Sequence, residues 1–148
     1  MNFSKRSRYG IRALIDLAQN TEDACMQLYD IAERNSISVK YLEQIFAALR
    51  KSGILRSIKG PQGGYFLAKA SGELTVAEII LALDGRYFLE EEECRGDEKG
   101  AAPALAVQSE IIVPLNEEID RFLNGLTLKK LVECSEKYKE AATDMYYI

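Results

Sequence analysis

The feature that most constrains the fold is residues 38–68, where a helical pattern is followed at once by two strand-like segments. Four apolar residues have the spacing of one helix face, namely Leu42, Ile45, Phe46 and Leu49. Ser38 is a favourable residue to begin this helix, and Gly53 is a natural end. Segments 54–58 and 65–68 are rich in strand formers and flank a Lys-Gly-Pro-Gln-Gly-Gly turn. The pattern predicts a helix and then a β-hairpin.

Helical patterns also lie on both sides of this segment. Apolar spacing predicts an amphipathic helix over roughly 4–20, capped by Ser4. A second, short helix should end near Asn35, because Asn can adopt the left-handed conformation found at helix ends. Thr75 can cap a further helix. Residues 1–85 are therefore predicted to form a winged helix-turn-helix domain, and the fold class is mainly α with a small β-hairpin.

The second half of the chain changes character. Residues 86–103 combine charges with Gly and predict an acidic flexible linker. Residues 104–148 predict a helical dimerisation region, because apolar residues recur at steps of three and four, as in a helix that packs lengthwise on another. These residues are Ile112, Leu115, Ile119, Phe122 and Leu126. Pro114 either starts this helix or kinks a longer one that begins near Leu105. A last short helix should follow Thr127.

Charge is distributed unequally along the chain. Residues 1–69 carry eleven Lys and Arg against six Asp and Glu, whereas residues 70–148 carry eight against seventeen. A basic half indicates a polyanionic partner, and the acidic half favours solubility.

Composition excludes several classes of protein. A chain of 148 residues with 47% hydrophobic and 28% charged residues fits a globular protein. No apolar stretch approaches the roughly 18 residues of a membrane span, so we expect a cytoplasmic protein with no membrane partner. The chain has no histidine, which excludes histidine-based catalysis and most zinc sites. With no nucleophile–base pair and no set of metal ligands, we predict that it is not an enzyme.

The three cysteines are too scattered to predict a disulfide framework. Cys25 and Cys94 are the redox candidates, although acidic neighbours raise the pKa of a thiol and make it less reactive. Cys134, on the last short helix, is expected to be a small buried residue.

The winged-helix geometry assigns candidate DNA-binding residues. The second helix of the pair presents its N-terminal side chains to base edges, and the wing lies against the backbone or minor groove. The amino end of the first helix favours phosphate. The candidates are Ser38, Lys40, Tyr41, Glu43, Gln44 and Lys51 on the second helix, Arg56, Lys59 and Gly60 at the wing, and Ser4, Lys5, Arg6 and Arg8 on the first helix.

Several short motifs resemble the bacterial winged-helix regulators typified by IscR, NsrR and CymR. The motifs are residues 8–10 (Arg-Tyr-Gly), 38–44 (Ser-Val-Lys-Tyr-Leu-Glu-Gln), 49–53 (Leu-Arg-Lys-Ser-Gly), 59–65 (Lys-Gly-Pro-Gln-Gly-Gly-Tyr), 75–79 (Thr-Val-Ala-Glu-Ile) and 127–131 (Thr-Leu-Lys-Lys-Leu). The resemblance implies a homodimeric transcription factor whose long C-terminal helix exchanges contacts with its two-fold mate. It implies base contacts by Ser38, Lys40, Glu43 and Gln44, and a minor-groove contact by Lys59, where many relatives have Arg.

The resemblance also bears on cofactors and partners. Iron–sulfur members of this family carry three closely spaced cysteines after the winged-helix module, whereas this chain has only Cys94 there. We expect no cofactor, because a cluster needs about four ligands and would have to recruit Cys134 or a partner chain. The tail of Tyr146, Tyr147 and Ile148 is similar to that of the cluster-less CymR regulators. It also looks like the C-terminal peptide that serine acetyltransferase inserts into cysteine synthase.

The tail therefore implies a repressor of cysteine or sulfur metabolism with cysteine synthase as its partner. Three alternatives stay open. In the first, the tail packs on its own dimer or is frayed. In the second, the protein is a redox-, iron- or nitric-oxide-responsive regulator of the same family. In the third, it is a dimeric adaptor that does not bind DNA.

Overall fold

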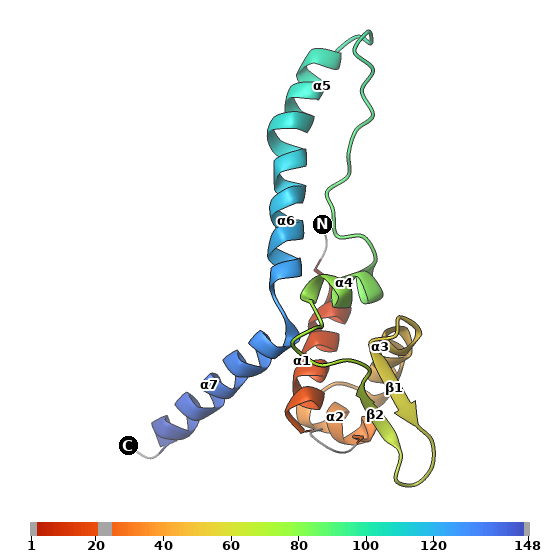
Figure 1. Cartoon of the computed structure of the whole chain (residues 1–148), viewed down its shortest axis with the longest axis vertical. Helices are drawn as coiled ribbons and strands as arrows, with labels where there is room; N and C mark the ends of the chain where they lie inside the picture. The colour runs from red at the N-terminus through yellow and green to blue at the C-terminus, as the bar shows by residue number, and fades with distance from the viewer. Residues whose placement is uncertain (1–2, 21–24, 147–148) are drawn as a thin grey trace.

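A computed structural model describes residues 3–20 and 25–146 of the chain. In chain order the elements are α1 (Lys5–Asn20), α2 (Leu28–Asn35), α3 (Val39–Lys51), β1 (Leu55–Ile58), β2 (Gly64–Leu67), α4 (Val76–Asp84), α5 (Ala101–Val107), the π-helical turn η1 (Gln108–Ile112), α6 (Val113–Gly125) and α7 (Leu128–Tyr146). Figure 1 shows α1 to α4 and the hairpin gathered in one body, from which α5 to α6 rise as a rod, while α7 contacts α1 and projects in another direction. The predicted mainly α fold with a winged helix-turn-helix is confirmed. Within the described ranges, no helix combines the length and apolar character needed to span a bilayer.

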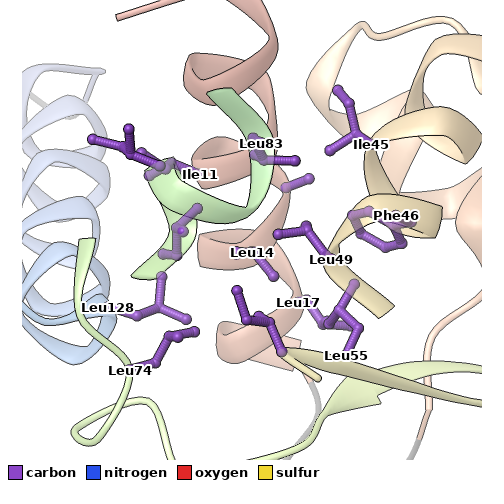
Figure 2. Packing of buried hydrophobic residues seen from close by; sticks show 14 of the residues in the cluster. Ile11, Leu14, Leu17, Ile45, Phe46, Leu49, Leu55, Leu74, Leu83 and Leu128 are labelled. Atoms are coloured by element: carbon purple, nitrogen blue, oxygen red, sulfur yellow. The ribbon is translucent and has the colours of Figure 1, made fainter. Parts of the chain in front are cut away.

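The first helix, α1, is the centre of the hydrophobic core. Leu14 and Leu17 of α1 are fully buried, and Phe46 and Leu49 of α3 pack against them (Figure 2). Leu128, at the start of α7, reaches the same core. Burial of one such side chain stabilises the fold by about 1.5–3 kcal/mol. The inner face of α3 is therefore held in the core, and its outer face is exposed.

A buried polar network joins α1 to α2. The carboxylate of Asp16 is 9% exposed and accepts hydrogen bonds from Arg34 Nε at 3.0 Å, Asn35 Nδ2 at 2.8 Å and Asn20 Nδ2 at 2.7 Å. The left-handed residue that ends α2 is Ser36, with φ of 53°, and not Asn35 as predicted. Asn35 is instead the last helical residue, and its Nδ2 donates to Asp16 and to the carbonyl of Ile31.

The third helix and the wing form as predicted. Ser38 caps α3, since its Oγ accepts a hydrogen bond from Tyr41 N at 3.2 Å. Gly53 follows the helix with φ of 77°. β1 then pairs antiparallel with β2. A Cβ added to Gly63 in the turn would overlap the carbonyl of Ile58, so this turn requires glycine.

The fourth helix begins with a capping box. Thr75 Oγ1 accepts a hydrogen bond from Glu78 N, and the Glu78 carboxylate accepts one from Thr75 N. Burial raises the pKa of Glu78, but hydrogen bonds from Lys69 and Thr75 outweigh burial and hold this pKa below its usual value. The predicted start of this helix is confirmed.

The elements α5, η1 and α6 form one continuous rod (Figure 1). Pro114 therefore lies inside a longer helix, which begins at Ala101 and not near Leu105. Proline has no N–H to donate, and its ring crowds the carbonyl four residues earlier. The wider π turn accommodates this defect, because Val113 N donates to the carbonyl of Gln108, five residues back.

Residues 86–100, between α4 and α5, form no helix or strand. Side chains of the rod hold the first half of this segment. Asn116 Oδ1 accepts from Leu89 N at 2.7 Å, and Asn116 Nδ2 donates to Leu89 O at 3.1 Å. Gln108 Oε1 accepts from Glu92 N at 3.1 Å. The first half of the segment therefore contacts the rod, and the predicted flexibility of the linker stays a prediction.

The last helix, α7, is much longer than the short helix predicted. It contains 19 residues, begins in the core at Leu128 and packs against α1, where Lys139 Nζ donates a hydrogen bond to Gln19 Oε1 at 2.9 Å, before it projects from the body (Figure 1). Residues 129–146 contain no Gly or Pro and are rich in strong helix formers, so the helix continues beyond the apolar residues that anchor it. Cys134 is exposed, which corrects the expectation that it would be buried.

Candidate nucleic-acid interface

The predicted base-reading residues lie on the outer face of α3. Its apolar face is buried against α1, which leaves the polar side chains in solvent. The exposed candidates on this helix are Ser38, Lys40, Glu43, Gln44 and Lys51. This exposure is what a helix that enters a major groove requires. The base contacts themselves stay a prediction.

Tyr41 differs from the other candidates on α3 because it is half-buried. Its ring packs edge-on against the ring of Tyr9 on α1, with 5.9 Å between centroids and 79° between planes. An aromatic pair of this kind contributes about 0.5–1.5 kcal/mol beyond its burial. Tyr41 therefore joins α3 to α1, a contact that the predicted DNA-binding role did not include.

The wing presents its predicted candidates to solvent. Arg56, Lys59 and Gly60 are all exposed. Arg50 Nη1, near the end of α3, donates a hydrogen bond to Ser57 Oγ of β1 at 3.2 Å. This bond links the wing to α3, and no motif in the sequence indicated it.

The loop before α2 supports the other side of the wing. Met26 and Tyr65 form a bridge, with N–H···O distances of 2.9 and 2.8 Å. Cys25 Sγ donates to the carbonyl of Gln62, in the wing turn, at 3.3 Å. The redox candidate Cys25 therefore lies in direct contact with the wing.

The amino end of α1 binds a carboxylate of the same chain, and the predicted phosphate contacts of this end stay a prediction. Ser4 caps α1 as predicted, with its Oγ accepting from Ser7 N at 3.0 Å. The Ser4 N–H and hydroxyl and the Ser7 hydroxyl all donate to the Asp84 carboxylate. Burial raises the pKa of Asp84, but these hydrogen bonds and the charge of Arg6 outweigh burial and hold the pKa low. Ser4 is thus hydrogen-bonded to Asp84, and the charge of half-buried Arg6 stabilises the same carboxylate. Lys5 and Arg8 are the exposed cations of the predicted set.

Two basic residues of α1 flank an aromatic ring that the prediction left out. Lys5 Nζ lies 5.3 Å from the centroid of the Tyr9 ring, and Arg12 Cζ lies 5.1 Å from it. Lys5 and Arg12 are exposed. The spacing of four and three residues, which places all three on one helix face, is the signal that could have identified them.

The predicted dimerisation residues are divided between two environments. Ile119 and Leu126 pack against the chain's own core, and Ile112 is half-buried. Leu115 and Phe122 are exposed, Phe122 at 68%. Phe122 borders a mainly apolar groove of about 610 Å³ between α1, α4, α6 and α7. Some of the predicted dimerisation residues therefore pack within their own chain, and the others are exposed.

The cysteines lie on three different parts of the fold. Cys25 contacts the wing, Cys94 lies in the segment after α4, and Cys134 is on α7. Burial, followed by the carboxylates of Glu92 and Glu98, raises the pKa of Cys94, as predicted for acidic neighbours.

An iron–sulfur cluster needs about four ligands. Among residues 3–20 and 25–146, no three His, Cys, Asp or Glu side chains are grouped so that they could hold a metal ion. The residues present therefore do not fit a cluster held by one chain. The expectation of no cofactor stays a prediction.

Only part of the predicted partner-binding tail can be placed. Tyr146 ends α7 and is 90% exposed. Tyr147 and Ile148 lie outside the described residues.

The sequence and the fold both match known transcriptional regulators. The model of the Rrf2 family, described as an iron-dependent transcriptional regulator, matches residues 3–134. The regulator IscR of Cronobacter sakazakii is 36% identical over 136 residues, which are 92% of this chain and 83% of that protein. IscR of Klebsiella pneumoniae is 37% identical over 92% of this chain and 82% of its own length.

Solved structures agree with this match. The structure of CymR, the global cysteine regulator of B. subtilis, has a TM-score of 0.74 and 31% identity, and the alignment covers 90% of this chain and 97% of that one. The structure of T. potens IscR has a TM-score of 0.72 and 31% identity, with coverage of 93% and 90%. Both IscR and CymR are among the similar proteins, so a special closeness to the CymR branch stays a prediction. The chain is a member of the Rrf2 family of transcriptional regulators.

Proposed function

We propose that the chain is a homodimeric DNA-binding repressor that recognises a partly palindromic duplex site. The observation that carries the proposal is the exposed polar face of α3 beside a basic wing. In the major groove, Gln44 can pair with adenine and Glu43 can accept from cytosine, while Lys59 contacts the minor groove. We propose no catalytic activity, and we place the protein in the cytoplasm with no membrane partner.

Titration against duplexes from its own promoter region tests this proposal. Measured by fluorescence anisotropy, log affinity should fall with log salt by about 0.9 per phosphate neutralised. Gln44→Ala should relax base preference at a cost of about 1–3 kcal/mol, whereas Lys5→Ala should weaken all sequences alike. Binding that does not depend on salt, or identical behaviour of the two variants, would contradict the proposal.

The proposed partner at the apolar groove is a second copy of the chain. Phe122 and Leu115 offer exposed apolar surface along the rod, and the groove beside Phe122 is mainly apolar. A two-fold dimer would place two α3 helices in successive major grooves, about 34–36 Å apart. In sedimentation equilibrium, Phe122→Glu should yield a monomer with weak affinity for the palindrome. Lys137→Glu, an exposed change on α7, should leave the dimer intact.

The proposed signal is the state of cysteine metabolism, with cysteine synthase bound by the tail. The likeness to CymR and the exposed end of α7 support this finer proposal. Removal of Tyr147 and Ile148 should abolish co-purification of cysteine synthase and preserve DNA binding. Co-purification that is unchanged by the deletion would refute the role of the tail.

The alternative is a regulator of the same family that responds to iron, nitric oxide or oxidants. The IscR relatives and the iron-dependent description of the family support it. The contact between Cys25 and the wing offers a route from thiol oxidation to DNA affinity, and one similar structure is that of Staphylococcus aureus CymR in an oxidized form. Iron in anaerobically purified protein would favour the cluster version. Loss of affinity on peroxide treatment that Cys25→Ser prevents would favour the thiol version. A dimer with no affinity for duplex DNA would be an adaptor.

A further inference from the structure

One face of α1 carries a tyrosine between two cations. Lys5 Nζ and Arg12 Cζ both lie within 5.5 Å of the centroid of the Tyr9 ring, at 5.3 and 5.1 Å. A cation at this distance is attracted by the negative face of an aromatic ring, and the attraction restricts a long side chain that would otherwise sample many rotamers. The ring therefore holds two exposed positive charges near one another.

Two contacts tie this face to the recognition helix. The Tyr9 ring packs against Tyr41 in the first turn of α3. Arg12 Nη2 donates a hydrogen bond of 2.7 Å to the carbonyl of Asn35, the last residue of α2, just before the turn that leads to Ser38, the cap of α3. The two cations thus lie beside the amino end of α3, which is the end that such a helix presents to the bases.

A phosphate at this face would have to be neutralised by side-chain cations, because the amino end of α1 is already occupied. The Ser4 amide and hydroxyl donate to Asp84, so the usual attraction of a helix amino end for anions acts on the chain's own carboxylate. A guanidinium has five N–H donors, and Arg12 uses one for Asn35. The same side chain can therefore bind a phosphodiester oxygen and hold the helix-turn-helix together.

We propose that Lys5, Tyr9 and Arg12 form one phosphate-binding unit, which grips the DNA backbone beside the groove that α3 enters. Lys5 and Arg12 contact phosphate, and Tyr9 is a positioning residue that acts through the two cations. The inference rests on the proposed DNA-binding function and adds two residues, Tyr9 and Arg12, to the interface.

Salt-dependent anisotropy titrations on one operator and one unrelated duplex test the unit. Lys5→Ala and Arg12→Ala should each lower the slope of log affinity against log salt by about 1. Tyr9→Leu should weaken binding to both duplexes about two- to fivefold, which corresponds to cation–π attractions at exposed sites. Tyr9→Phe keeps the ring and should bind as the wild type does. Lys137→Ala, the loss of an exposed charge on α7, should change neither slope nor affinity.

A melting curve for each variant separates positioning from folding. Tyr9→Leu that retains the wild-type affinity and slope would overturn the role of Tyr9. A loss of affinity in Tyr9→Leu that Tyr9→Phe shares, or that disappears when the data are corrected for unfolded protein, would also overturn it. Arg12 is exposed, so an unchanged slope in folded Arg12→Ala would refute its contact with phosphate. A wild-type protein that binds neither duplex would refute the proposed function itself, which is a different result from wild-type binding with unaffected variants.

Discussion

The carboxylate of Asp16 provides a direct test of how the helix-turn-helix is held together. Substitution by Ala removes the acceptor for Arg34, Asn35 and Asn20 at once. Asp16 is 9% exposed, so water does not readily replace these bonds, whereas the Arg34 side chain is 45% exposed and can be hydrated when its partner is lost.

The size of the effect follows from these exposures. A hydrogen bond to a charged group contributes about 1.5–3 kcal/mol, and removal of one partner of a buried ion pair costs about 3–5 kcal/mol. Solvent reaches Arg34, so the loss should fall below that range. We expect Asp16→Ala to lower the free energy of unfolding by about 2–3 kcal/mol. For a chain of about 150 residues this corresponds to a melting temperature lower by about 4–12 °C.

Urea denaturation followed by far-ultraviolet circular dichroism measures this loss. All variants should be compared at one protein concentration, because self-association shifts the midpoint. Asp97→Ala removes an exposed carboxylate from the segment after α4 and should change the free energy of unfolding by less than about 0.5 kcal/mol. If Asp16→Ala changes it no more than this control does, the network does not hold α2 to α1 and the reasoning fails.

Three further predictions concern the wing, the segment after α4 and the amino end of α1. Gly63→Ala should distort the wing turn, because the new Cβ would overlap backbone, and should weaken DNA binding. Gly96→Ala adds a Cβ in open space and should leave DNA binding unchanged. Equal DNA affinities of the two variants would contradict this account. Asn116→Ala removes both hydrogen bonds to Leu89 and should release the first half of the segment, so a protease specific for Glu should cut at Glu90 and Glu91 severalfold faster; an unchanged rate at these two sites would show that the amide contacts do not hold it. The pKa of Asp84 is lowered by folding, so its contribution to stability is present at neutral pH and is lost as the pH falls below about 4. Asp84→Asn should therefore flatten the decline in the free energy of unfolding at acid pH. The same pH dependence in wild type and variant would contradict a contribution of Asp84.

The identity of the first four helices and of the wing could be predicted because their signals are local. Ser38 and Thr75 each bind a backbone N–H three residues later, so a short window of sequence contains the whole capping interaction. The Gly-rich turn at the wing is equally local, since Gly63 faces a carbonyl only five residues away. The buried face of α3 could be predicted because helical periodicity determines which residues share a face.

The length of α7 was missed for a different reason. The prediction followed apolar periodicity, which decreases once the helix leaves the core after Val132. Helix propensity, carried by the Lys, Glu and Ala residues that follow, continues to Tyr146. Cys134 was accordingly placed in an interior that this part of α7 does not have.

The sequence alone therefore determined the order of the helices, the wing and the polar outer face of α3, because caps, turns and periodicity depend on neighbours within one or two turns. Which groups these elements bind depends on contacts between distant parts of the chain. Ser4 is paired with a carboxylate 80 positions away, and the ring of Tyr9 meets Tyr41 across two helices. No local pattern encodes such partners, because a donor or a ring packs against whatever the folded chain brings within a few ångströms. In the proposal, phosphate binding on α1 therefore depends on Lys5, which the sequence indicated, and on Arg12, which the structure places beside the same tyrosine ring.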